Sequence, residues 1–180
     1  MRIIAGRAKG RRLRAPAGPG TRPMMDRARE ALFSALGPAV VEARVLDLYA
    51  GSGSIGLEAL SRGAAEVVFV ERGRAALAAL RANVEAVGLG GVIVAGDVGS
   101  HLAGGDGLFD LVFVDPPFSL PLASLEEVLA LAASFLGPGG MVVVHRRSGS
   151  GPPLAPGLVE VSRRRYGDTE ITVLAREEDL

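Results

Sequence analysis

Short apolar segments rich in valine alternate with segments of helical periodicity from residue 45 onward, and this alternation limits the chain to few folds. Strands that alternate with helices are typical of βαβ units, in which helices cover both faces of a parallel sheet. Strands are predicted at Val45–Tyr49, Val67–Glu71, Val92–Ala95, Leu111–Asp115 and Met141–His145. Helices are predicted at Leu57–Ser61, Arg74–Val87 and Ser124–Phe135, the last of them ended by Gly137 and Pro138.

The C-terminal segment breaks this pattern. Leu158–Arg165 and Glu170–Ala175 are both suited to strands, and only the turn-like Tyr166–Thr169 lies between them. Two strands joined by so short a turn are expected to form an antiparallel hairpin. The sequence therefore predicts an α/β protein whose mostly parallel seven-stranded sheet carries helices on both faces and closes with an antiparallel hairpin.

Residues 1–40 are predicted to form a basic N-terminal extension that is not independent of the main domain, residues 41–180. Arg2–Leu13 has the pattern of a short basic strand or hairpin, and a link rich in proline and glycine follows it. A helix is predicted at Arg27–Leu36, where small and apolar residues recur at helical spacing, and Asp26 is suited to cap it. So short an extension has too little sequence for a core of its own.

Basic residues are concentrated at the start of the chain. The whole chain is formally neutral, but residues 1–29 hold nine basic residues and one acidic residue. Such asymmetry indicates a polyanionic partner, although a solvated surface is the alternative because arginine is common throughout the chain. The residues predicted to bind this partner are Arg2, Arg7, Lys9, Arg11, Arg12, Arg22 and Arg27.

The composition excludes several classes of protein. The chain has no cysteine, which excludes disulfides and thiolate metal sites. His101 and His145 have no second ligand at metal spacing, so both are expected to be structural or surface residues, and no metal is expected. No apolar run approaches the ~18 residues of a membrane span, and no signal peptide is recognisable. We expect a soluble cytoplasmic protein.

A glycine-rich loop follows the first predicted strand of the main domain. Gly51–Gly56 matches the spacing G-x-G-x-x-G, in which the glycines permit a sharp turn and let a ligand contact the backbone. Glu71 comes twenty residues after Gly51 at the end of the next strand and is placed to accept hydrogen bonds from ribose hydroxyls. No Lys-Ser/Thr pair follows the glycines, which excludes a P-loop. The pattern leaves two ligands open, a nicotinamide dinucleotide and S-adenosylmethionine.

The segment Asp115-Pro116-Pro117-Phe118 favours the second ligand. It follows a predicted strand, and ligands of open α/β sheets bind at the carboxyl ends of the strands. The Asp115 carboxylate and the Pro116 carbonyl are acceptors that can hold both N–H bonds of an amino group. Phe118 offers a flat face on which an extracted base can stack. A nicotinamide-dependent oxidoreductase has no evident use for this set.

Both motifs resemble those of a known class of enzymes. Asp115–Phe118 resembles the D/N-P-P-F/Y motif of amino-directed methyltransferases, and Leu46–Gly53 resembles their S-adenosylmethionine motif. Nearly the whole chain resembles the RsmD-type family, bacterial methyltransferases that act on guanine N2 of 16S ribosomal RNA. The matching segments are Met1–Gly6, Lys9–Arg11, Arg22-Pro23, Asp26-Arg27, Arg29–Phe33, Gly56–Ala64 and Tyr166–Thr169.

The resemblance implies a Rossmann-like class I methyltransferase fold, S-adenosylmethionine as cofactor, and 16S rRNA as substrate, alone or within a 30S subunit. Since nothing in the sequence indicates an oligomeric interface, we expect a monomer. It implies that the basic N-terminal residues bind RNA and that Asp115, Pro116, Pro117 and Phe118 hold the target guanine. The implied cofactor-binding residues are Asp47, Tyr49, Gly51, Ser52, Gly53, Glu71 and Asp97. The chain departs from the family at Met24 and Met25, where threonine is usual, and at His145, where an acid is expected.

Other functions stay open at this point. The motif Asp115–Phe118 does not separate guanine from adenine, so an N6-adenine methyltransferase acting on DNA or tRNA is the nearest alternative. A nicotinamide-dependent oxidoreductase and a non-catalytic RNA-binding or ribosome-assembly factor are the alternatives from other classes. Asn83, in the helix after Glu71, is expected to pack or bond locally.

Overall fold

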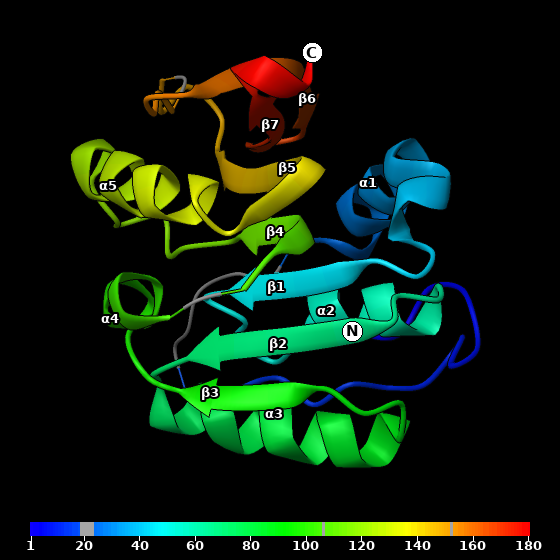
Figure 1. Cartoon of the computed structure of the whole chain (residues 1–180). Helices are drawn as coiled ribbons and strands as arrows, with labels where there is room; N and C mark the ends of the chain where they lie inside the picture. The colour runs from blue at the N-terminus through cyan, green and yellow to red at the C-terminus, as the bar shows by residue number, and fades with distance from the viewer. Residues whose placement is uncertain (19–23, 106, 152) are drawn as a thin grey trace.

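A seven-stranded sheet with the strand order β3-β2-β1-β4-β5-β7-β6 runs through the middle of the computed structural model (Figure 1). The structure describes residues 1–18, 24–105, 107–151 and 153–180. Strands β1 to β5 are parallel to one another, and β7 pairs antiparallel with both β5 and β6. The strands are β1 (Arg44–Leu48), β2 (Glu66–Glu71), β3 (Val92–Ala95), β4 (Phe109–Val114), β5 (Leu136–Arg147), β6 (Leu158–Tyr166) and β7 (Thr169–Arg176).

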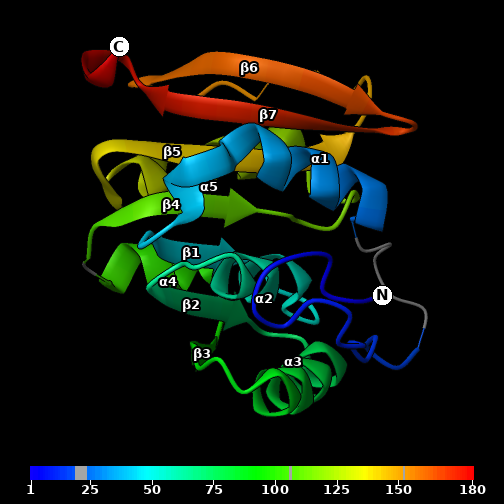
Figure 2. The same cartoon turned by 90° about the vertical axis from the view of Figure 1, so that its right-hand side faces the viewer.

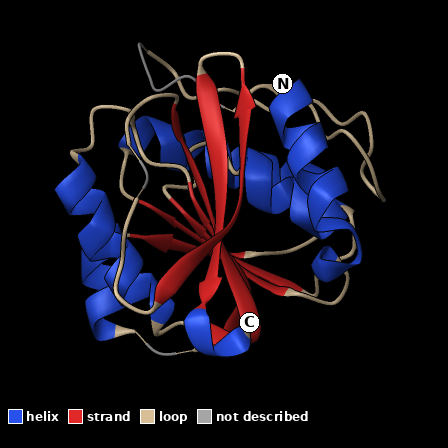
Figure 3. Ribbon diagram, turned by 90° about the horizontal axis from the view of Figure 1, so that it is seen from above, coloured by secondary structure: helices blue, strands red, loops and turns tan. Residues whose placement is uncertain are grey.

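Helices cover both faces of this sheet, as the view from above shows (Figure 3). Side chains alternate along β4, so that Leu111 and Phe113 face one apolar cluster while Val112 and Val114 face the other. The first cluster is covered by α1 (Asp26–Leu36), α2 (Ser54–Ser61) and α3 (Arg74–Val87). The second is covered by α4 (Val98–Gly104) and α5 (Leu122–Ala133).

The predicted fold class is confirmed, including the closing hairpin. Tyr166 pairs with Thr169 across the two-residue turn, where Gly167 has a φ of 62°. A positive φ is common in such tight turns and suits glycine. The hairpin places β7 beside β5, in the interior of the sheet, and leaves β6 at its edge.

Several predicted boundaries are wrong. Helix α4 was not predicted, because it is short and contains two glycines. Strand β5 begins at Leu136 rather than Met141, since Leu136 pairs with Phe109 ahead of an irregularity in the register. Helix α5 therefore ends at Ala133, and Gly137 and Pro138 lie within the strand.

The capping prediction for α1 is also wrong. The N-cap residue is Met25, with no side-chain cap hydrogen bond, and Asp26 is the first helical residue. The Asp26 carboxylate instead accepts a hydrogen bond from Arg29 at 3.0 Å, one turn along the helix. This ion pair diverts the side chain from the free N–H groups of the first turn.

The N-terminal extension forms a short hairpin that packs beside α2 (Figure 2). Arg2 and Arg12 form an antiparallel bridge, and the Ile3 N–H donates to the Arg11 carbonyl at 2.9 Å. Ile3, Ala8 and Leu13 are buried in the same apolar cluster as α1, α2 and α3. The predicted basic hairpin is confirmed, and its apolar side chains belong to the core of the main domain.

A buried carboxylate on α2 anchors this hairpin. Glu58 is fully buried, and its two oxygens accept hydrogen bonds from the backbone N–H groups of Ile4 at 2.7 Å and Ala5 at 3.0 Å. Arg62 pairs with the same carboxylate at 2.7 Å, and the buried Arg29 guanidinium lies 3.8 Å from it.

Arg29 completes the anchor by donating to the Arg2 carbonyl at 2.5 Å. Burial lowers the pKa of this guanidinium, and the charges of Asp26 and Glu58 oppose that effect. A buried charge is tolerated only when it is paired and hydrogen-bonded. We therefore propose that residues 1–40 and 41–180 unfold as one unit.

Replacing Glu58 with glutamine is expected to lower the free energy of unfolding by about 3–5 kcal/mol, because the change leaves the buried Arg29 paired with Asp26 alone and removes one of the two oxygens that accept from Ile4 and Ala5. Urea unfolding followed by circular dichroism measures this loss. The matched control is Glu66→Gln, since the Glu66–Arg44 pair is solvent-exposed, with side-chain exposures of 42% and 47%, and should contribute less than about 1 kcal/mol. An unchanged main transition in Glu58→Gln would contradict a single unfolding unit.

Candidate functional site

The glycine-rich loop connects β1 to α2 in a conformation that excludes side chains. Gly53 has a φ of 80°, and a Cβ there would lie 2.5 Å from Leu80 Cδ1. A Cβ on Gly56 would lie 2.4 Å from Phe69 Cε1 and 2.7 Å from Val67 Cγ1. The first turn of α2 thus sits directly against β2, with its free N–H groups at the carboxyl edge of the sheet.

Asp47 holds this loop from within the protein. Its side chain is buried, and Oδ2 accepts a hydrogen bond from the Gly56 N–H at 3.0 Å. Burial raises the pKa of Asp47 to about 8, and the negative charges of Asp115 and Glu71 add to this effect. Asp47 therefore fixes the position of the first turn of α2 through its hydrogen bond with Gly56.

Glu71 bridges the end of β2 and the glycine-rich loop. Its Oε2 accepts the Gly51 N–H at 2.8 Å, and its Oε1 accepts the N–H groups of Arg72 at 2.8 Å and Gly73 at 2.6 Å. The carboxylate is partly exposed, and each oxygen has more than one lone pair. Glu71 is thus held rigidly at the mouth of the loop and keeps acceptor capacity for a ligand.

Tyr49 and Asp97 flank this loop. Tyr49 is a non-glycine residue with a positive φ of 59°, and its pKa is raised by burial and by the charge of Asp97. Asp97 caps α4, and the hydrogen bond from the Ser100 N–H lowers its pKa. Its other oxygen pairs with the exposed Arg72 guanidinium at 3.2 Å. Asp97 therefore presents an ionised, half-exposed carboxylate at the end of β3.

Asp115 and Phe118 lie at the end of β4, next to β1 in the sheet. Oδ1 of Asp115 lies 2.7 Å from Nδ1 of His145, at the end of β5. The rings of Phe118 and His145 meet edge to face, with centroids 5.8 Å apart. Pro116 is buried, while Asp115, Pro117 and Phe118 are partly exposed.

The parallel strands bring these residues to one edge of the sheet. Asp47, Glu71, Asp97 and Asp115 stand at or near the carboxyl ends of β1, β2, β3 and β4, whose registers align them side by side. The arrowheads of β1, β2 and β3 point to the same side in Figure 1. The glycine-rich loop and the Asp115–Phe118 motif therefore border a common space.

The contacts of two buried polar residues, His145 and Asn83, were not predicted from the sequence. His145, expected to be structural or on the surface, is buried and bonds to Asp115. Asn83 is buried, and its bonds are long-range rather than local, so that part of the prediction is wrong. Its amide donates to the carbonyls of Ser52 at 2.9 Å and Arg14 at 3.0 Å and accepts from the Arg14 N–H at 2.8 Å. A lone asparagine on the inner face of an amphipathic helix was the available signal.

The predicted RNA-binding residues are exposed wherever the structure describes them. Arg2, Lys9 and Arg27 line one groove between the N-terminal hairpin and α1, together with Asp26 and Glu30. Arg7 and Arg11 bond to the carbonyls of Leu60 and Ala86, respectively, and Arg12 lies in the bridge to Arg2. Arg22 lies outside the described residues.

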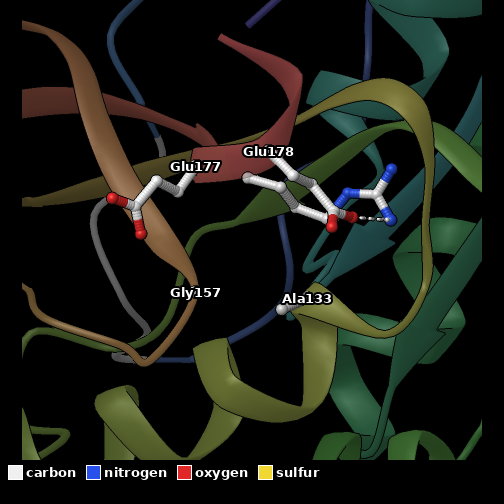
Figure 4. A pocket seen from close by; sticks show the side chains of 5 residues that line it. Ala133, Gly157, Glu177 and Glu178 are labelled. Atoms are coloured by element: carbon white, nitrogen blue, oxygen red, sulfur yellow. Dashed lines mark ion pairs between the residues drawn. The ribbon is translucent and has the colours of Figure 1, made fainter.

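A second hollow lies at the opposite edge of the sheet, between the end of α5 and the C-terminal residues (Figure 4). Arg176 pairs there with Glu178 at 3.3 Å and with Asp179 at 2.9 Å. Arg176 is therefore already paired with neighbouring carboxylates. The hollow contains none of the predicted site residues.

Among the described residues, no group of three or more His, Asp or Glu side chains could hold a metal ion. No helix in the same part of the chain is both long and apolar enough to span a membrane.

Known proteins resemble this chain over nearly its whole length. Residues 1–175 match the family described as "Conserved hypothetical protein 95". Ribosomal RNA small subunit methyltransferase D of Escherichia coli K12 is 39% identical over 168 residues, which cover 92% of this chain and 84% of that protein.

Solved structures agree. A structure from Escherichia coli described as a candidate methyltransferase has a TM-score of 0.87 and 36% identity, covering 98% of each chain. A hypothetical protein of Thermus thermophilus has a TM-score of 0.80 and 36% identity, covering 96% of this chain and 98% of that one. Together with the glycine-rich loop and the Asp115–Phe118 motif, these matches show that the chain belongs to the family of ribosomal RNA small subunit methyltransferase D.

Proposed function

We propose that this protein is an S-adenosylmethionine-dependent methyltransferase that methylates the exocyclic N2 amino group of a guanine in 16S ribosomal RNA. The observation that carries the proposal is the shared sheet edge, where the glycine-rich loop and Glu71 face the same space as Asp115 and Phe118. The similarity to ribosomal RNA small subunit methyltransferase D of Escherichia coli supports a ribosomal RNA substrate of the small subunit.

The cofactor space fits an adenosyl group with a positively charged sulfonium. A Cβ at Gly53 or Gly56 would collide with Leu80 or Phe69 in the core, so these glycines let the loop and the start of α2 pack against the sheet with free N–H groups of the first turn at its edge. Glu71 would accept the ribose hydroxyls, and Asp97 would accept from the adenine amino group. When bound, S-adenosylmethionine supplies an activated methyl group on sulfur.

The substrate side of the site is built to hold an amino group. With Oδ1 of Asp115 engaged by His145, Oδ2 and the Pro116 carbonyl are left to accept the two N–H bonds of the base. These acceptors favour a pyramidal nitrogen whose lone pair points at the methyl group, so alignment supplies much of the acceleration. The proton leaves the nitrogen more easily after transfer than before it.

Access to this site requires an unstacked base, at a cost of a few kcal/mol. Phe118 offers a stacking surface that offsets part of this cost. The basic groove of Arg2, Lys9 and Arg27 supports RNA binding by the extension, with phosphate contacts giving affinity rather than sequence selection. The proposed substrate is RNA alone or within a 30S subunit, the proposed enzyme is a metal-independent monomer, and the proposed compartment is the bacterial cytoplasm.

The first test is transfer of labelled methyl groups to small-subunit RNA and particles that lack native modifications. N2-methylguanine at a single position is the expected product, identified by nucleoside analysis. N6-methyladenine as the product would confirm methyl transfer to an amino group but contradict guanine as the target base. Tight binding of S-adenosylmethionine without any methyl transfer would favour a non-catalytic RNA-binding factor.

Asp115→Ala is expected to lower kcat at least about 1000-fold, because it removes an acceptor that aligns the reacting nitrogen. Cofactor affinity, measured by calorimetry, should stay within about twofold. The matched control is Asp110→Ala on the same strand, since Asp110 lies at its opposite end and accepts only from the Arg44 N–H among the described hydrogen bonds. Turnover of Asp115→Ala near the wild-type rate would contradict the proposed mechanism.

The double variant Arg2→Ala, Lys9→Ala is expected to weaken RNA binding and reduce the slope of log K against log salt by about 1.4, since each lost phosphate contact removes about 0.7. Filter binding over a salt series measures the slope. Arg74→Ala, Arg81→Ala on the exposed face of α3 is the control with equal charge loss. A slope unchanged in the first variant would place the RNA contact elsewhere.

A further inference from the structure

His145 is the buried residue of this site whose placement the proposed chemistry leaves unexplained. Its relative exposure is 2%, and Nδ1 lies 2.7 Å from Asp115 Oδ1. The Nε2 atom is also buried and has no hydrogen-bond partner among the described residues. Such an unpaired nitrogen is destabilising, and an apolar side chain in its place would avoid that cost. A polar residue kept there in spite of this cost points to a role in the site.

The hydrogen bond decides how Asp115 can act. A carboxylate oxygen accepts a hydrogen bond, so in the 2.7 Å contact with Asp115 the Nδ1 atom of His145 is the donor. This bond occupies Oδ1 and fixes the rotation of the carboxylate, because β5 holds the histidine through its pairing with β7. The oxygen left for substrate is Oδ2, in one orientation.

The same imidazole also contacts Phe118. Its ring meets the phenylalanine ring edge to face, with 5.8 Å between the centroids and 61° between the planes. Asp115 and Phe118 are three residues apart, with two prolines between them, and one buried side chain therefore contacts both ends of the motif. A single group on β5 thus relates the amine acceptor to the stacking surface.

We propose that His145 is a positioning residue. It donates a hydrogen bond from Nδ1 to Asp115 and packs against Phe118, so that the Asp115 carboxylate and the Phe118 ring contact the same base. This inference rests on the proposed function of the site. Misplacement of reacting groups by about 1 Å can cost as much as 100-fold in rate, so a positioning group of this kind affects kcat more than binding.

The test compares two substitutions of His145. His145→Asn keeps an N–H donor near the position of Nδ1 and should retain kcat within about threefold of wild type. His145→Leu fills the space without a donor and should lower kcat about 30-fold, with the KM for RNA and the affinity for S-adenosylmethionine within about twofold. His101→Leu is the control histidine, because it lies on α4 against Phe135 and away from the site. Equal losses in the Asn and Leu variants, or a fully active Leu variant, would overturn the proposal.

A double-mutant cycle separates positioning from folding. In the Asp115→Ala background, His145→Leu should cause no further loss of kcat, because leucine keeps an apolar contact with Phe118 and the lost hydrogen bond acts through Asp115. A further loss of tenfold or more would overturn that route. Melting temperature and cofactor binding of every variant show whether a lost rate comes from misfolding.

A readout without turnover keeps this inference apart from the proposed function. The ¹⁵N chemical shifts of His145 in the whole protein should report the Nδ1–H tautomer in the wild type and a change of that signal in Asp115→Ala. An Nε2–H tautomer in the wild type overturns the positioning role whatever the substrate is. Absence of methyl transfer by the wild type, with the Nδ1–H tautomer present, would overturn the proposed function alone.

Discussion

The close approach of α2 to the sheet is the constraint on which the rest of the structure depends. Gly56 has no space for a Cβ beside Phe69 and Val67, and its N–H is held by the buried Asp47. This contact directs the free N–H groups of the first turn toward the carboxyl edge of β1 and β2. Two residues farther on, it sets Glu58 against the backbone of the N-terminal hairpin. One packing contact thus places both the ligand loop and the basic surface.

The charges at the sheet edge follow from their surroundings. Asp47, Glu71 and Asp115 stand on three adjacent strands, and their mutual repulsion together with burial raises the pKa of Asp47 to about 8. Burial therefore favours the neutral form of Asp47, and Glu71, Asp97 and Asp115 are the carboxyl groups of this edge that are not fully buried. A cationic sulfonium is favoured in such a space, since Glu71 and Asp115 face it and the nearby Arg72 guanidinium is paired with Asp97.

The fold was predictable from the sequence because its signals are local. Buried parallel strands are short apolar runs in the sequence, and the glycine at position 167 indicates the tight turn of the hairpin. The motif at Asp115–Phe118 was also recognisable, since its residues are contiguous. The start of β5 was not, because Leu136 joins the strand only through its pairing with Phe109. The long-range bonds of Asn83 and the contact of His145 with Asp115 were not predictable for the same reason, since their partners, Arg14 and Asp115, lie 69 and 30 residues away in the sequence.

The anchoring of the N-terminal hairpin has an evolutionary consequence. Glu58, Ser61 and Asn83 belong to the main domain, yet their buried polar groups are satisfied by the backbone of residues 4–14. Exchange of the hairpin for an unrelated segment would remove these backbone partners from three buried side chains. Recombination of modules is therefore a costly change for this architecture. Point substitutions on the exposed side of the hairpin, at positions such as Arg2 and Lys9, leave the anchor intact and are the accessible route by which the charge of this surface changes.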